Sequence, residues 1–426
     1  MLLAEPSVYF REILKRFPNS YLAEDGAQVI IGIDCVYLEG EDFAKLEDAL
    51  KNGVKICEFA GLFGVTGWEA VRRFERVGES KSALYDFPTY FYADARAYLQ
   101  YDKQTRVYSF YGANSYLDGL ESASENHSNL KPYFKVVSNL KKEREEFGAA
   151  FEKAREYIAA GEAFQIVLSR TLHLESDLEP FEFYERLKAQ NPSHYMYYFP
   201  TPYGVIAGSS PELVMLIKGD EIKVSPIAGT RPRGADANED ARLKAELLAD
   251  EKELAEHRML VDLARNDVGK FAKAGSVKVR NLMHVEFFES VMHIVSDVIG
   301  TRESSKSNFD VLSVVFPAGT LSGSPKIRAM QIINELEPHS RGIYGGGIGF
   351  WHYNGDVQMA ILIRSAIFVP HAEDNSNLKS AKTYDVYIGA GYGQVFDSDP
   401  EKEYQEICNK RKSCVKVFEQ VCEERK

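Results

Sequence analysis

The order of predicted strands and helices beyond residue 161 is the feature that most limits the fold of this chain. Segments 163–168 and 203–207 are short apolar runs typical of strands, and 213–217 with 221–224 form a predicted hairpin. Parallel strands need a crossover of a dozen or more residues between them, usually a helix. The sequence lacks a regular alternation of strands and helices, so it predicts a mixed α and β architecture without a simple parallel sheet.

Longer periodic segments predict the helices. Residues 141–160 have the Lys, Glu, Arg and Ala content of an amphipathic helix that ends near Gly161. Helical patterns of the same kind recur at 241–264, 289–299 and 400–423. Glycine-rich strands are predicted at 345–350 and 387–395, with a polar loop at 372–382.

The N-terminal part of the chain predicts a smaller mixed region. A strand is expected at 29–33 and a helix at 43–50. The composition changes at 112–132, where Gly, Asn, Ser and Glu replace apolar residues, which indicates an exposed linker. We therefore predict an N-terminal region of residues 1–140 that packs on a second, larger domain of residues 141–426.

Charge and cysteine content limit the partners and the compartment. The 426 residues carry 63 acidic against 51 basic side chains, a net charge of −12, which argues against nucleic acid as a partner. Five scattered cysteines without a C-x-x-C pair fit a reducing compartment. The N-terminus has no signal-peptide pattern, and no apolar run approaches the roughly 18 residues of a membrane span. We therefore expect a cytoplasmic protein that does not enter the membrane.

Two pairs of glutamates recur with helical spacing. Glu253 and Glu256, like Glu403 and Glu406, are three residues apart, which places each pair on one face of a helix. Two such faces together could hold a hard cation such as Mg²⁺. By spacing alone, however, most pairs of this kind are solvated helix surfaces in so acidic a chain.

Two glycine-rich motifs fail the tests for nucleotide loops. In 317–326 (PAGTLSGSPK), Pro325 stands where a phosphate-binding loop needs its second glycine, and no Ser or Thr follows Lys326. What remains is a loop before a helix, whose amides and Thr320 could receive a carboxylate. The run Gly389 to Gly393 continues as a strand, which excludes a dinucleotide fold and indicates close approach of a ligand or another backbone.

Two polar residues interrupt apolar stretches. Arg364 follows four aliphatic residues, and a buried arginine there needs an anionic partner, from the protein or from a substrate. His293 lies within VMHIV, where a histidine is more often a core residue than a catalyst. No Ser, Cys and His pattern resembles a nucleophilic triad.

Taken in order, the motifs of residues 140–420 resemble the chorismate-utilising enzymes, and within them the component I subunits of anthranilate synthase. The matching segments are 164–170 (FQIVLSR), 208–212 (GSSPE), 226–234 (PIAGTRPRG), 255–257 (AEH), 262–267 (DLARND), 317–326 and 397–400 (DSDP) with the second glutamate pair. Segments 61–64 and 72–75 carry a looser resemblance. So many motifs in series make chance a poor explanation.

The resemblance implies an α+β fold, with large antiparallel β-sheets packed as a sandwich and helices on the outside. It implies one Mg²⁺ held by Glu256 and Glu406, supported by Glu253 and Glu403. Glu212 matches the general acid that protonates the departing 4-hydroxyl of chorismate, and His293 a histidine that assists elimination. The residues at substrate-binding positions are Gly229, Thr230, Thr320, Tyr344, Arg364, Gly391, Tyr392, Gly393 and Lys410.

Two positions choose among members of this family. Isochorismate and salicylate synthases carry Lys in place of Gln165, and aminodeoxychorismate synthases commonly carry Lys in place of Ala228. The resemblance therefore implies conversion of chorismate and ammonia to anthranilate and pyruvate. Aminodeoxychorismate synthase, aminodeoxyisochorismate synthase and a silent chorismate- or tryptophan-binding subunit are the alternatives.

The sequence departs from the family at the substrate loop and at the regulatory site. Tyr392 and Gln394 stand where small and aliphatic residues are usual. A tryptophan site in the N-terminal region would use Asp25 and the segment His194, Tyr195 and Met196. Because Asp25 and His194 replace the expected Ser and Pro, we predict weak inhibition by tryptophan.

The resemblance also implies a partner. Members of the family take ammonia from a separate glutamine amidotransferase subunit. No cysteine of this chain has the surroundings of an amidotransferase nucleophile. We therefore expect that subunit to act in trans.

Overall fold

The structure is a computed structural model that describes residues 4–120, 132–288, 291–371 and 382–423. The helices are α1 (Pro6–Arg16), α2 (Phe43–Asn52), α3 (Leu140–Ala159), α4 (Pro180–Gln190), α5 (Ala237–Ala249), α6 (Glu251–Gly269), α7 (Asn308–Val315), α8 (Gly319–Ser322), α9 (Lys326–Leu336) and α10 (Pro400–Glu423), with the 3₁₀ helices η1 (Trp68–Arg73) and η2 (Asn114–Leu117). Among these helices of the described residues, none is long and apolar enough to cross a membrane.

The strands of the described residues pair antiparallel throughout and form one hydrogen-bonded network. They are β1 (Tyr21–Glu24), β2 (Gln28–Gly40), β3 (Gly61–Thr66), β4 (Tyr90–Asp102), β5 (Val107–Tyr111), β6 (Phe134–Val136), β7 (Gln165–Ser176), β8 (Tyr195–Thr201), β9 (Gly204–Ser210), β10 (Leu213–Lys218), β11 (Glu221–Val224), β12 (Ile227–Pro232), β13 (Lys278–Phe287), β14 (Val291–Thr301), β15 (Gly323–Ser324), β16 (Gly347–His352), β17 (Val357–Ile361), β18 (Ser365–Pro370) and β19 (Tyr384–Gln394). The predicted α+β class, a large antiparallel sheet with helices, is confirmed.

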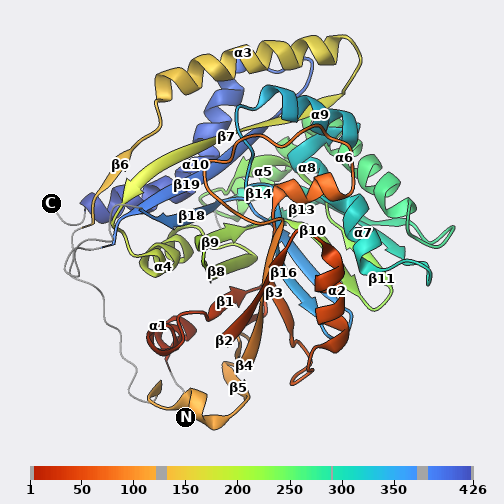
Figure 1. Cartoon of the computed structure of the whole chain (residues 1–426). Coiled ribbons are helices and arrows are strands. Elements are labelled where there is room, and N and C mark those ends of the chain that lie inside the picture. Colours follow the sequence, from red (N-terminus) through yellow and green to blue (C-terminus); the bar gives the residue numbers. More distant parts are fainter. Residues whose placement is uncertain (1–3, 121–131, 289–290, 372–381, 424–426) are drawn as a thin grey trace.

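The helices lie against the sheet network and bury its apolar faces. Helix α10 packs on β19, α9 on β7, α4 on β9 and α6 on β12. Figure 1 shows α3 and α10 running along the β7–β19 pair, with α9 beside them and α6 and α7 farther to the right. Several strands, such as β3 and β14, are buried along nearly their whole length, because both of their faces are covered.

Strands from the N-terminal and the C-terminal parts of the sequence pair directly with one another. Strand β1 pairs with β8, and β3 pairs with β16 from Gly61↔His352 to Thr66↔Gly347. The division into residues 1–140 and 141–426 stays a prediction. The predicted linker at 112–132 begins with η2, and its residues 121–131 lie outside the described residues, as do residues 372–381 of the predicted loop.

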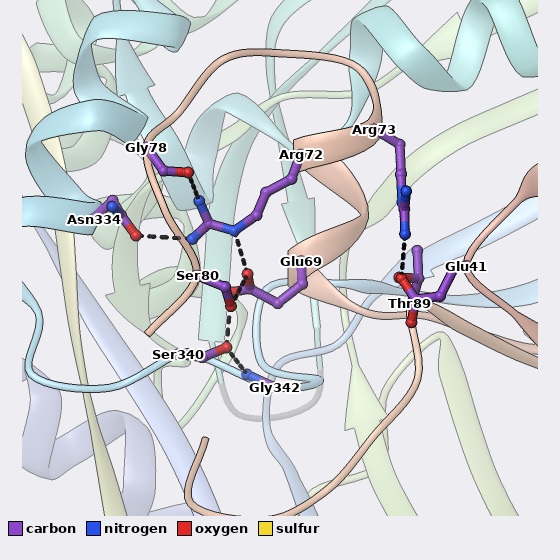
Figure 2. A network of polar contacts seen from close by, with 10 residues as sticks. All are labelled: Glu41, Glu69, Arg72, Arg73, Gly78, Ser80, Thr89, Asn334, Ser340 and Gly342. Atoms are coloured by element: carbon purple, nitrogen blue, oxygen red, sulfur yellow. Dashed lines mark hydrogen bonds and ion pairs between the residues drawn. The ribbon is translucent and has the colours of Figure 1, made fainter. Parts of the chain in front are cut away.

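The segment of the looser N-terminal resemblance ties η1 to α9 (Figure 2). Arg72 donates to the side-chain oxygen of Asn334 (2.8 Å) and pairs with Glu69. Glu69 in turn accepts from Ser340 Oγ (2.7 Å). Arg73 points away from this group toward Glu41. Arg72 therefore links the N-terminal region to the loop after α9, which carries residues of the candidate site.

Several predicted elements are confirmed with close boundaries. The helices predicted at 141–160 and 400–423 are α3 and α10, and the predicted hairpin is β10 with β11. Asn139 explains the start of α3, because its side chain accepts from Lys142 N and satisfies a free amide of the first turn. Pro400 opens α10, where a missing N–H costs nothing.

The helix predicted at 289–299 is wrong. The described part of that segment is strand β14, which pairs with β11, β12 and β13. Its β-branched side chains are buried on both faces, and such a run is a buried strand even without alternation. The single helix predicted at 241–264 is also wrong, because Asp250 ends α5 and caps α6 by accepting from Lys252 N and Glu253 N.

Candidate active site

Strands β7 and β19 form the floor of the candidate site. Ser169 lies opposite Gly391, but its N–H donates to Glu337 (2.7 Å). In an antiparallel ladder, residues of such a non-hydrogen-bonded pair turn their N–H and C=O groups away from each other. The carbonyl of Gly391 accordingly accepts from Lys410 Nζ (2.8 Å) at the other edge of β19. The amides of Gly391 and Gly393, two residues apart, point to that same edge.

The face of β19 that belongs to the site has space only for glycine. An added Cβ at Gly389 would lie 2.4 Å from the Tyr344 ring, and one at Gly391 would lie 3.0 Å from Tyr344 Oη. At Gly393 it would lie 2.7 Å from Gln165 Nε2. The three alternate glycines thus give room to Tyr344 and Gln165, which line the same face.

Tyr392 faces the opposite side of the sheet. Its side chain is 1% exposed and packs against Phe147 and Phe151, with ring centroids 5.1 and 6.1 Å apart. Its hydroxyl donates to Gln394 Oε1 (3.2 Å), so both unusual residues of the loop belong to the core. By the alternation of the ladder, the amide of Tyr392 pairs with Leu168. The amides that reach the site are those of its two glycine neighbours.

The two predicted glutamate pairs, the acidic corner (Glu253, Glu256, Glu403 and Glu406), come from α6 and α10. Glu256 Oε1 accepts from Gln165 Nε2 (2.7 Å), and Glu406 Oε1 accepts from Lys410 Nζ (2.6 Å). A cation–carboxylate contact also reaches Glu253, where Arg231 Nη1 lies 3.7 Å away. The corner therefore joins the floor through Gln165 and Lys410.

The carboxylates of the acidic corner affect one another's pKa, because ionisation of one disfavours ionisation of its neighbour. Burial and the neighbouring Glu406 raise the pKa of Glu256, and burial, with a contribution from Glu406, raises the pKa of Glu403 to about 7. Burial opposes ionisation of Glu406 too, but the ammonium of Lys410 holds its pKa below the ordinary value. No three His, Cys, Asp or Glu side chains of the described residues form a complete metal cage.

Glu212 is a carboxyl group almost sealed from solvent. Its side chain is 8% exposed, and Thr320 Oγ1 donates to Oε1 (2.7 Å). Burial raises the pKa of Glu212 to about 7 against this hydrogen bond and the more distant charge of Lys410. A carboxyl group with this pKa can hold a proton near neutral pH and release it to a bound molecule.

His293 lies on β14, opposite a bulge in β12. Gly229 has φ +70° within this bulge, and its carbonyl lies 3.0 Å from His293 Nδ1, as does Thr230 Oγ1. Because a carbonyl only accepts, the proton of the ring sits on Nδ1. Burial, with the nearby charges of Arg364 and Lys410, lowers the pKa of His293 to about 4. The ring is thus neutral at pH 7, and its Nε2 carries no proton.

Arg364 brings an uncompensated charge to the site. It has φ +51° in the turn before β18, where its carbonyl accepts from Ser209 N (3.2 Å). Burial lowers the pKa of its guanidinium group, and Cys414, Tyr344 and Glu406 are its polar neighbours. Within the described part of the chain its guanidinium makes neither an ion pair nor a hydrogen bond. A buried cation in this state is a receptor for an anion.

The outer edge of β7 carries a buried ion pair, the edge clamp (Glu337 and Arg341). Glu337 accepts from the N–H and Oγ of Ser169 and from Arg341 Nη2 (2.7 Å). Arg341 also donates to the Val167 carbonyl (2.6 Å) and lies over the Trp68 ring, 4.1 Å from its centroid. The clamp therefore satisfies the edge of β7 between its partners β15 and β6.

The residues predicted for the regulatory site lie around a separate cavity of about 70 Å³. Asp25, Tyr195 and Met196 line it together with Phe63 and other aromatic residues. His194 does not line this cavity, because its ring packs on Phe288 (5.6 Å between centroids). Binding of tryptophan in this cavity stays a prediction.

The comparison with protein families gives a match over most of the chain. The model described as "chorismate binding enzyme" matches residues 13–416. The chain belongs to the chorismate binding enzyme family. The match includes every residue of the floor, the acidic corner and the edge clamp.

Named relatives of the chorismate binding enzyme family are similar over part of their length. The chain is 47% identical to the anthranilate synthase component 1 of Aquifex aeolicus, over 65% of this chain and 53% of that protein. It is 46% identical to the protein of the same name from Acetivibrio thermocellus, over 68% and 55%. The chain thus spans about half the length of the curated relatives it matches.

Solved structures of the family match nearly the whole fold. Anthranilate synthase component I of Streptococcus pneumoniae has a TM-score of 0.75 at 29% identity, covering 97% of this chain and 93% of that one. The menaquinone-specific isochorismate synthase of Escherichia coli has a TM-score of 0.75 at 16% identity, covering 98% and 92%. The second likeness shows the fold alone.

In this member of the family, the structure brings most of the predicted residues together. The floor, the acidic corner, Glu212, His293 and Arg364 share polar contacts or charge interactions with Lys410, Gln165 or Thr320. The sequence interpretation missed the edge clamp. Its signal was the spacing of four residues between a Glu and an Arg, too common a pattern to single out.

Proposed function

We propose that this chain is the component I subunit of an anthranilate synthase, which converts chorismate and ammonia to anthranilate and pyruvate. One contact carries the proposal: the amide of Gln165 donates to Glu256 in the acidic corner. In the related enzymes that add water, a lysine is expected at this position, and an uncharged amide cannot serve as a base. Ala228, next to Gly229 in β12, argues in the same way against aminodeoxychorismate synthase.

The charges of the site support a dianionic substrate. Arg364 is partly buried, makes no ion pair within the described residues and suits the carboxylate of the enolpyruvyl side chain, with Tyr344 beside it. Lys410 and the amides of Gly391 and Gly393 face the same edge of β19 and suit an anionic oxygen. The net charge of −12 does not oppose this, because the site gathers its own cations.

The chemistry of the acidic corner fits Mg²⁺, to which Glu256 and Glu406 would contribute ligands. Mg²⁺ commonly takes one or two protein carboxylates, with water and substrate oxygens as its other ligands. The raised pKa values of Glu256 and Glu403 mark an excess of negative charge that a divalent cation would relieve. Bound Mg²⁺ would neutralise the ring carboxylate of chorismate and favour departure of the hydroxyl group.

Glu212 and His293 divide the proton transfers. Glu212 protonates the 4-hydroxyl of chorismate, which leaves as water while ammonia adds at C2. His293, neutral and protonated at Nδ1, has Nε2 available to assist removal of the C2 proton as pyruvate leaves. Thr320 holds the Glu212 carboxyl group in place. Both groups thus have the protonation state that their role requires at neutral pH.

Ammonia would come from a separate glutamine amidotransferase. Two of the buried cysteines are poor nucleophiles, since burial raises the pKa of Cys414 to about 12 and that of Cys57 to about 11. The chain alone should accept ammonium ions but not glutamine as the nitrogen source. Added amidotransferase subunit should restore activity with glutamine.

The test is a product assay with chorismate, ammonium ions and Mg²⁺. We expect fluorescent anthranilate and equimolar pyruvate, both lost on addition of EDTA. An amino-bearing product without pyruvate would instead identify an aminodeoxychorismate or aminodeoxyisochorismate synthase. Chorismate binding without turnover would identify a silent binding subunit and refute the proposal.

A further inference from the structure

A chain of aromatic rings leads from the N-terminal strands to His293. His194 precedes β8, and its ring lies at 62° to Phe288 with centroids 5.6 Å apart. Phe288 follows β13, and its ring lies at 67° to His293 with centroids 5.3 Å apart. Both contacts are edge-to-face, the favoured geometry for aromatic pairs. Three rings from three separate segments therefore touch in sequence.

The middle ring of this chain has a fixed backbone. The N–H of Phe288 donates to the Val291 carbonyl (2.8 Å), and its own carbonyl accepts from Arg233 Nη1 (2.7 Å). Arg233 is held in turn by a double contact with Asp240. Phe288 therefore presents a firmly held ring against which His293 packs.

His293 needs such a surface. Its one hydrogen-bonded atom is Nδ1, which lies 3.0 Å from both Gly229 O and Thr230 Oγ1. Apart from its bond to Cβ, the ring is held by this one atom. It can therefore still rotate, and Nε2, on the far side of the ring, then moves most. Phe288 packs on the ring and limits that rotation. Efficient proton transfer depends on such placement, since an error of 1 Å can lower a rate about a hundredfold.

The first ring reaches the N-terminal region. A Cβ at Gly26, in the turn between β1 and β2, would lie 4.0 Å from His194 Cδ2, an ordinary van der Waals contact. Asp25 fixes this turn by accepting from the amides of Ala27 and Gln28. The real glycine has no such atom, so the β1–β2 turn passes close to the His194 ring and leaves space beside it.

We propose that Phe288 is a positioning residue for His293, with His194 as its support. This inference rests on the proposed role of His293 in elimination. Phe288 and His194 set the direction of Nε2 without contributing a group to the reaction.

The first experiment compares Phe288→Leu with Phe288→Tyr in the anthranilate assay. Leucine removes the edge-to-face contact, so we expect kcat to fall about ten- to a hundredfold while KM for chorismate changes less than about twofold. Tyrosine keeps the ring and should retain kcat within about threefold. Phe287→Leu is the matched control, because Phe287 is exposed at the end of β13, next to Phe288, and should leave kcat unchanged.

The second experiment removes the histidine itself. If Phe288 acts through His293, then Phe288→Leu should lower kcat no further in a His293→Ala background. An equal loss in both backgrounds would overturn the proposal and leave a purely structural role. His194→Leu should give a smaller loss, about three- to tenfold, that does not multiply with that of Phe288→Leu. If the losses of His194→Leu and Phe288→Leu multiply fully, His194 does not act through Phe288.

A third measurement separates this inference from the proposed function. Nitrogen and carbon NMR of labelled histidine reports the tautomer and the mobility of the His293 ring without turnover. We expect a single Nδ1–H form in the wild type, with added ring motion in Phe288→Leu but not in Phe287→Leu. An inactive wild type with this NMR result would refute only the proposed function, whereas an unchanged ring in Phe288→Leu would refute the stack.

Discussion

Glu212 and Glu337 are two buried carboxylates in opposite circumstances. They are 8% and 4% exposed, so burial is similar. Glu337, in the edge clamp, accepts from a guanidinium group, a backbone amide and a hydroxyl group. Glu212 accepts from the hydroxyl group of Thr320 and from no cation. The difference separates a carboxylate that holds the fold from a carboxyl group that can carry a proton.

The comparison shows that burial alone does not mark a functional acid. Desolvation penalises the charged form, and a cation with several hydrogen bonds removes that penalty. At Glu212 the penalty remains and appears as a pKa of about 7. The protein thus accepts a less stable environment at one carboxyl group, as expected for a site of chemistry.

The largest expected effect comes from removing the proton of Glu212. Glu212→Gln keeps the shape and the hydrogen bond to Thr320 but has no acidic proton, so kcat should fall about 10²- to 10⁴-fold. Chorismate affinity should stay within a few fold of wild type in isothermal titration. Full activity of this variant would show that Glu212, like Glu337, does not donate a proton in the reaction.

Removal of the carboxylate of the edge clamp should act on stability. Glu337→Ala leaves Arg341 buried without its partner and frees the Ser169 amide, so the free energy of unfolding should fall by about 3 to 5 kcal/mol. Urea unfolding followed by circular dichroism measures this loss. Glu337→Gln retains an acceptor for Ser169 and should lose less. An unchanged midpoint in Glu337→Ala would show that the clamp does not stabilise the fold.

The pH dependence should follow Glu212. Its protonated form is the active one, so kcat should fall tenfold per unit as pH rises above about 7. Since its pKa is raised from 4.5, the folded state binds more protons than the unfolded state between these values. Wild-type stability should therefore decrease from about pH 4.5 to 7, relative to Glu212→Gln. Identical stability profiles of the two proteins would contradict this.

The smallest effect concerns the single hydrogen bond at Glu212. Thr320 donates to the carboxylate and lowers its pKa, so Thr320→Val should raise it and move the alkaline limb of the rate profile upward. A hydrogen bond to a charged group is worth about 1.5 to 3 kcal/mol, which limits the shift to roughly one to two pH units. Thr320→Ser keeps the donor and should leave the limb in place.

Local signals explain which elements the sequence could predict. Helices α3 and α10 have long periodic patterns with a capping Asn139 and an opening Pro400. The segment of β14 was wrongly predicted as a helix, because His293, Ser296 and Asp297 interrupt its apolar run at near-helical spacing. Its β-branched content was the better signal, and pairing with three neighbours decided the outcome.

The sequence could predict which residues form the candidate site, but not their pKa values. Motifs named Glu212, Glu256 and Glu406, yet their pKa values depend on residues distant in sequence or on other helices. Lys410 pairs with Glu406 four residues earlier on α10, a contact that spacing could predict, but the surroundings of Arg364 follow only from the packing of the strands. Such differences arise from tertiary contacts, which spacing along the chain does not record.

The edge clamp has a consequence for how copies of this protein meet in solution. A free stretch of strand edge is a template on which another chain can add a strand and start aggregation. Along β7, Glu337 takes the N–H of Ser169 and Arg341 takes the carbonyl of Val167. Both groups that an incoming strand would need are occupied by side chains. The clamp therefore leaves neither of these two groups free to pair with an added strand.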